Sequence, residues 1–128
     1  MVNSFSPADI EAIAWAAIET LLWSTAQDDE GGSDANGYWD SSEFPVSPIA
    51  LGSMIEDVES FIYLAGDDLD GMELGQIGHD LTLTRNGHGA GFWDRGLGER
   101  GDRLSKHATS MGNIDSVFVD SSDMIIWE

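Results

Sequence analysis

Two segments of the chain begin with the same Ser-Pro pair and continue with apolar residues at intervals of three and four. Ser6-Pro7 precedes the first, with Asp9 in the position of a capping-box acid, and Ser47-Pro48 precedes the second. Serine at the N-cap and proline at the first helical position are typical helix starts. The apolar spacing then places one buried face on each helix. The pattern predicts helices over residues 7–26 and 48–65.

The second half of the chain has a different pattern. Leu81–Thr84 alternates apolar and polar residues, and Asn86-Gly87 offers the chemistry of a two-residue hairpin turn. We therefore expect hairpins over residues 80–94 and 116–127, with a short third helix over 102–111 between them. Helices first and hairpins last indicate an α+β fold, with the two N-terminal helices packed on a small antiparallel sheet. The expected core comprises Ile13, Ile18, Leu21, Ile55, Val58, Ile62, Leu83, Phe92 and Val117.

Length, cysteine content and hydropathy exclude several classes of protein. The 128 residues predict a single domain, 1–128, and the absence of cysteine excludes disulfides and thiolate metal sites. No apolar run approaches the ~18–20 residues that a membrane span needs. We expect a protein of the cytoplasm, without membrane association.

Charge is distributed very unevenly along the chain. The formal net charge is −19, and all five Lys and Arg lie between Arg85 and Lys106, whereas the first 84 residues contain none. Such asymmetry favours an interaction surface, and repulsion excludes direct binding to nucleic acid. Two alternatives stay open: an acidic coat that only maintains solubility, and adaptation to high salt.

If the acidic segment is an interaction surface, its natural partner is a basic protein that normally binds nucleic acid. Dense carboxylates then imitate the phosphate backbone, and aromatic side chains add apolar anchors. The residues expected to contact the partner are Asp28, Asp29, Glu30, Asp34, Tyr38, Trp39, Asp40, Glu43, Glu56, Asp57, Glu59, Asp67, Asp68, Asp70 and Glu73.

Trp15, Glu19 and Trp23 form a separate stripe of the first helix at four-residue spacing. The two tryptophans are expected either to join a secondary core or to contact a partner.

A second polar group lies within the expected 80–94 hairpin and just before it. A histidine with carboxylates can bind a divalent cation or act as an acid–base pair, which makes a small enzyme or ligand-binding domain the alternative function. The spacing matches no established catalytic or metal motif, so we expect no catalytic residue, no cofactor and no metal. We expect the group to be mainly structural, with Arg85 or Asn86 bonded within the domain and Asp94 as the candidate partner of Arg85. The members of this group are His79, Asp80, Arg85, Asn86, His88, Trp93 and Asp94.

The run GHDLTLTRNGHGAGFWDRGLG, residues 78–98, resembles a block found in a family of small bacteriophage-encoded proteins. In that family the block is similar to HDFWLTRNGHGAGFWDRG and is followed by a short helix and a hairpin. The resemblance covers about residues 78–128 and departs at Leu81-Thr82, where the family tends to be aromatic. It implies a phage origin and brings no established activity. Together with the charge, it favours a non-enzymatic inhibitor of a host nucleic-acid-binding protein, with an anti-CRISPR, anti-restriction or similar anti-defence role.

Overall fold

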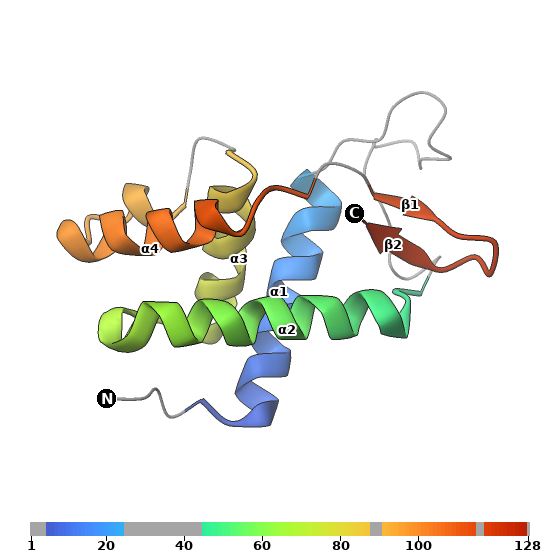
Figure 1. Ribbon diagram of the computed structural model, residues 1–128, viewed down its shortest axis with the longest axis horizontal. Coiled ribbons are helices and arrows are strands. Elements are labelled where there is room, and N and C mark those ends of the chain that lie inside the picture. The colour runs from blue at the N-terminus through green and yellow to red at the C-terminus, as the bar shows by residue number, and fades with distance from the viewer. Residues whose placement is uncertain (1–4, 25–44, 88–90, 115–116, 128) are drawn as a thin grey trace.

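A computed structural model describes residues 5–24, 45–87, 91–114 and 117–127 (Figure 1). Within these ranges the chain forms four α-helices, two 3-10 turns and a two-stranded antiparallel sheet. In chain order these are α1 (Pro7–Ser24), α2 (Pro48–Ala65), η1 (Gly66–Leu69), α3 (Leu74–Arg85), η2 (Phe92–Asp94), α4 (Glu99–Ser110), β1 (Val117–Val119) and β2 (Ile125–Trp127).

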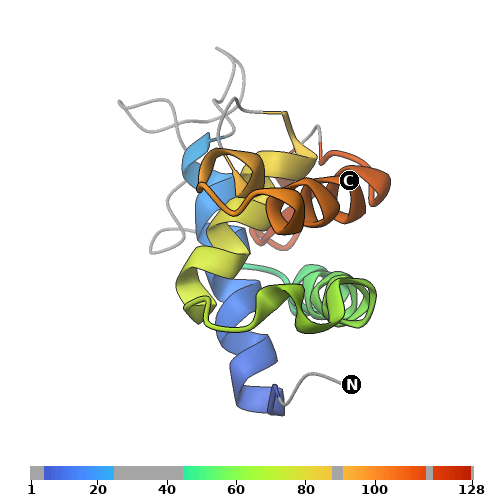
Figure 2. The ribbon, with the colours of Figure 1, turned by 90° about the vertical axis from the view of Figure 1, so that its left-hand side faces the viewer.

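The helices form two layers. α1 packs mainly against α3, and this pair is crossed by α2 and α4 (Figure 1), with α2 seen nearly end-on in Figure 2. Phe61 of α2 and Phe92 of η2 stack in the core at a centroid distance of 5.4 Å. α3 contacts α1, α4 and η2, so it joins the N-terminal helix to the C-terminal part of the helical region.

The two predicted N-terminal helices are confirmed, together with their start signals. The Asp9 N–H donates to Ser6 Oγ and the Ser6 N–H donates to the Asp9 carboxylate, both at 3.1 Å, which is the reciprocal capping box. At the second helix, Ser47 Oγ accepts from the Ile49 N–H at 3.2 Å. Most of the expected core is also buried: Ile13, Ile18, Leu21, Val58, Ile62, Leu83 and Phe92, whereas Ile55 and Val117 are half-buried.

The hairpin predicted over residues 80–94 is wrong. Leu81–Thr84 belongs to α3, and Asn86 and Gly87 end that helix with Gly87 at φ 71°. The alternating pattern suggested a half-exposed strand, but both threonines are buried and form hydrogen bonds across the core. Thr82 Oγ1 donates to the Ala17 carbonyl, and Thr84 Oγ1 accepts from the Phe92 N–H. A helix that is buried on nearly all sides lacks the polar face that marks an amphipathic helix.

The C-terminal hairpin is confirmed as a short sheet of β1 and β2, with Phe118 opposite Ile126. The segment just before α2 bonds to the same sheet, because the Ser47 N–H donates to the Ile125 carbonyl and the Ile125 N–H to the Pro45 carbonyl. The helix predicted over 102–111 is also present, beginning earlier, at Glu99.

Candidate functional site

The basic residues of the C-terminal part bond back to the acidic segment 57–80. Arg85 pairs with Asp57 at 3.0 Å, Arg95 with Asp80 at 2.7 Å, and Arg103 with Asp68 at 2.8 Å. The guanidinium of Arg100 donates to the Asp70 main-chain carbonyl. The acidic and basic segments that the sequence separates therefore meet in the fold, where arginines of the basic segment neutralise some carboxylates of the acidic one.

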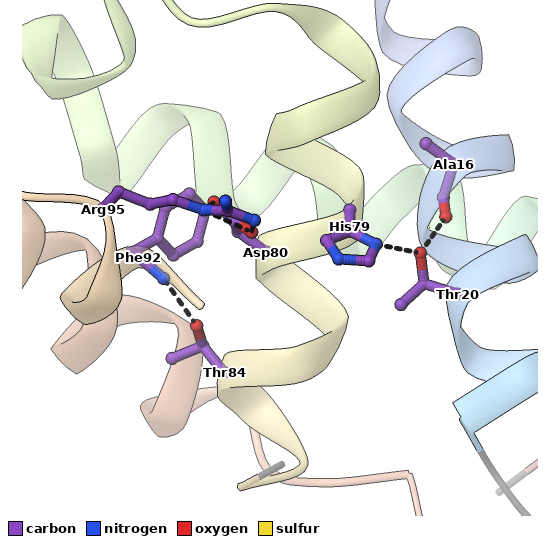
Figure 3. Close-up of polar contacts among 7 residues, drawn as sticks. All are labelled: Ala16, Thr20, His79, Asp80, Thr84, Phe92 and Arg95. Atoms are coloured by element: carbon purple, nitrogen blue, oxygen red, sulfur yellow. Dashed lines mark hydrogen bonds and ion pairs between the residues drawn. The ribbon is translucent and has the colours of Figure 1, made fainter. Parts of the chain in front are cut away.

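The Asp80–Arg95 pair is the most buried of these contacts. The Asp80 side chain is fully buried, and its two carboxylate oxygens accept from Nε and NH2 of Arg95 at 2.7–3.3 Å (Figure 3). A side-on guanidinium of this kind satisfies both oxygens of a carboxylate at once. The pair fixes η2 to the middle of α3.

Arg85 joins three elements. Its side chain is buried, and besides Asp57 on α2 it donates to the carbonyls of Gly112 and Met111, which follow α4. A cation at these carbonyls also opposes the negative end of the α4 dipole. The neighbouring Asn86 accepts from the Ile114 N–H at 2.8 Å. The expected bonding of Arg85 or Asn86 within the chain is confirmed, with Asp57 as the described ion-pair partner of Arg85. The expected pairing with Asp94 falls on a side chain that lies outside what the structure describes.

Asp68 and Arg103 form an exposed bidentate pair between η1 and α4. The hydrogen bond from Arg103 lowers the pKa of the Asp68 carboxyl below its usual value, and the nearby charges of Arg100 and His107 act in the same direction. Asp68, like Asp57, is thus engaged inside the molecule.

The acidic residues expected to contact a partner fall into three groups. Asp57 and Asp68 are ion-paired within the chain. Exposed side chains that form no ion pair in the described ranges belong to Glu56, Glu59, Asp67, Asp70 and Glu73. The residues that lie outside the described ranges are Asp28, Asp29, Glu30, Asp34, Tyr38, Trp39, Asp40 and Glu43.

The polar group expected around residues 79–94 points in several directions. His79 faces α1, Arg85 faces α2 and α4, and Trp93 is exposed on η2. His88 and the Asp94 side chain lie outside what the structure describes. Among the described residues, no three His, Asp or Glu side chains come together as a metal site, and no helix is long and apolar enough to cross a membrane.

His79 has two partners on α1 that the sequence analysis did not connect with it. Its Nδ1 lies 3.2 Å from Thr20 Oγ1, and its ring stacks on Trp23 at a centroid distance of 5.8 Å (Figure 3 shows the Thr20 contact). The indole of Trp23 remains 52% exposed. The four-residue stripe had marked Trp23 as unusual, but no local signal links it to a histidine so distant in sequence.

Comparison of the chain with family models, with curated proteins and with solved structures found no match.

Proposed function

We propose that the protein is a phage-type acidic inhibitor that occupies the nucleic-acid-binding surface of a basic host protein, in an anti-CRISPR, anti-restriction or similar anti-defence role. The supporting observation is the division of its charges. Four of the five basic residues bond inward, and the exposed carboxylates of Glu56, Glu59, Asp67, Asp70 and Glu73 form no ion pair in the described ranges.

The exposed side of α2 supplies the best-defined part of this surface. Glu56 and Glu59 lie in its middle, and Ile49 and Tyr63 lie near its ends with 85% and 81% of their surface exposed. Spacings of seven, three and four residues keep all four side chains on one helical face. Carboxylates flanked by apolar groups are suited to a protein surface that combines cations with apolar contacts.

The spacing of the carboxylates is comparable to that of phosphates. Glu56 and Glu59 are about 4.5 Å apart along the axis at the ~1.5 Å rise of a helix, against about 3.4 Å for successive phosphates of one DNA strand. Asp67, Asp70 and Glu73 add three exposed carboxylates in the segment that follows α2. Lysine and arginine side chains with which the partner binds phosphates can therefore bind these carboxylates instead.

The test is competition. Proteins captured from a bacterial host lysate by the immobilised chain at low salt are purified, and each is loaded with labelled duplex DNA or RNA. We expect the chain to displace the nucleic acid without binding it. The double variant Glu56→Lys, Glu59→Lys should lose at least tenfold in displacement, because two attractions become repulsions at the contact.

The matched control is Glu11→Lys with Asp102→Lys, which changes the net charge equally but at exposed carboxylates of α1 and α4. Asp57 and Asp68 are left intact in both variants because their reversal would break internal ion pairs. An equal loss of displacement in both variants would contradict a defined contact surface on α2. Displacement would then depend only on the overall charge of the protein. If the Glu56→Lys, Glu59→Lys variant displaces nucleic acid as well as the wild type does, α2 does not contact the partner.

A further inference from the structure

The hydroxyl of Thr20 determines which nitrogen of His79 carries the proton. Thr20 Oγ1 donates its only hydrogen to the Ala16 carbonyl at 2.8 Å, and it also lies 3.2 Å from His79 Nδ1 (Figure 3). A hydroxyl has one hydrogen to donate and lone pairs to accept with. The contact between Thr20 and His79 is therefore made by the Nδ1–H donating to Thr20 Oγ1, which leaves the lone pair of a neutral imidazole on Nε2.

His79 is half-buried, and its Nε2 is not one of the buried side-chain atoms that lack a partner in the described ranges. This nitrogen has no hydrogen-bond partner among the described residues, and the only buried side-chain polar atom without a partner there is Ser105 Oγ. The Trp23 indole lies beside it. Because the 5.8 Å between ring centroids exceeds the ~3.5–4.0 Å of full stacking contact, the two rings overlap only in part. An acceptor nitrogen and a free aromatic surface are thus presented together, in a fixed geometry.

We propose that His79 Nε2 and the Trp23 indole form the binding site for an arginine side chain of the basic partner. The inference rests on the proposed function for the identity of that partner. A guanidinium is planar, donates several N–H groups and is attracted to the face of an indole. The charge of the surroundings suits it as well, since α1 carries no Lys or Arg and the exposed carboxylate of Glu19 lies one helical turn before Trp23.

The first measurement is the tautomer. Long-range ¹H–¹⁵N correlation of the histidine rings, recorded at alkaline pH on the neutral form, should show His79 protonated at Nδ1. Thr20→Val keeps the shape of the side chain but removes the acceptor, so the proton should move toward Nε2. Thr20→Ser retains the hydroxyl and should behave as the wild type. A wild-type ring protonated at Nε2 would overturn the proposal.

The second measurement is a titration with hexa-arginine, and separately with hexalysine, at 0.15 M salt. Hexa-arginine should shift the His79 Nε2 and Trp23 indole resonances with an affinity at least several-fold above that of hexalysine. Thr20→Val and Trp23→Leu should each weaken that shift several-fold. Equal affinities for the two peptides, or shifts confined to other residues, would overturn the arginine site.

The outcomes separate this site from the proposed function. The Glu56→Lys, Glu59→Lys variant should still show the hexa-arginine shift at His79, even where it has lost displacement of nucleic acid. If Thr20→Val and Trp23→Leu retain full displacement activity, the arginine site is wrong and the inhibitor function stands. If hexa-arginine binds as expected but no captured protein is displaced from nucleic acid, the inhibitor function fails and the site stands.

Discussion

Asp80 carries a fully buried carboxylate, and within the described part of the chain its ion-pair partner is Arg95. Removing one partner of such a pair is costly because the other charge then remains in a medium that solvates it poorly. Asp80 also sits beside His79, so the pair helps to keep α3 in the orientation that directs His79 toward α1. The sequence places Asp80 in the polar group around residues 79–94, but it does not identify Arg95 as its partner.

Arg95→Ala should lower the free energy of unfolding by about 2–4 kcal/mol, somewhat below the ~3–5 kcal/mol of a fully buried pair because Arg95 is partly exposed. Urea unfolding followed by circular dichroism at pH 7 measures the change. Adding Asp80→Asn removes the unpaired charge and should recover part of the loss. A loss below about 1 kcal/mol would mean that water or another group solvates the carboxylate.

Arg103→Ala is the matched control, since it breaks an exposed bidentate pair and should have a much smaller effect. Its effect should depend on pH in a definite direction. Because Arg103 lowers the pKa of folded Asp68 below the ordinary 3.8, the pair stabilises the fold above that pH and loses its contribution as the pH falls through the lowered value. The Asp68 carboxyl resonance should titrate at higher pH in the variant than in the wild type.

At the scale of elements, local signals predicted α1 and α2 and failed for α3. The N-terminal helices begin with serine caps and each has an apolar face, and both signals are independent of the rest of the fold. α3 has no side-chain cap, contains Gly75 and Gly78, and buries polar residues whose partners lie on α1 and η2. Its conformation is imposed by packing, which overrides the β-propensity of Thr82 and Thr84.

The glycines of α3 allow this dependence on packing to be measured. A Cβ at Gly78 would meet the Ile13 carbonyl and lie 2.7 Å from Ala16 Cβ and 2.8 Å from the Ala17 nitrogen. Because backbone atoms cannot turn aside, Gly78→Ala should destabilise the protein by roughly 1–3 kcal/mol despite its better helix propensity. Gly75→Ala, on the same helix with open space around it, should stabilise by about 0.5–1 kcal/mol.

Thermal unfolding of both alanine variants provides the comparison. If Gly78→Ala were as stable as Gly75→Ala, the close approach of α1 and α3 would be wrong. The Thr20–His79 contact that depends on it would then need re-examination, because His79 directly follows Gly78.

At the scale of the whole molecule, the sequence predicted the elements better than their assembly. The order of predicted helices and hairpins indicated an α+β chain, and the structure contains helices with a small antiparallel sheet. The crossing of the two helical layers and the inward bonding of the arginines depend on contacts between residues far apart in sequence, such as Arg85 with Asp57. The periodicity of apolar residues along the sequence identifies helices and strands, but it carries no information about such contacts.

The net charge of −19 leads to a prediction about salt that also separates adaptation to high salt from the other interpretations of the acidic surface. A chain of this length has a radius of gyration of about 14 Å, whereas the Debye length falls from ~30 Å at 0.01 M to ~8 Å at 0.15 M. Repulsion across the whole molecule is therefore screened within that range. The melting temperature should rise between 0.01 and about 0.2 M KCl and then become nearly constant.

The Glu56→Lys, Glu59→Lys variant, with a net charge of −15, should show a smaller rise because it has less repulsion to screen. Differential scanning calorimetry of both proteins from 0.01 to 3 M KCl measures this. A salt-adapted coat predicts a different curve, since it requires molar salt for full stability. If the melting temperature continues to climb steeply between 1 and 3 M, the acidic surface is an adaptation to salt, and its carboxylates no longer argue for a basic partner.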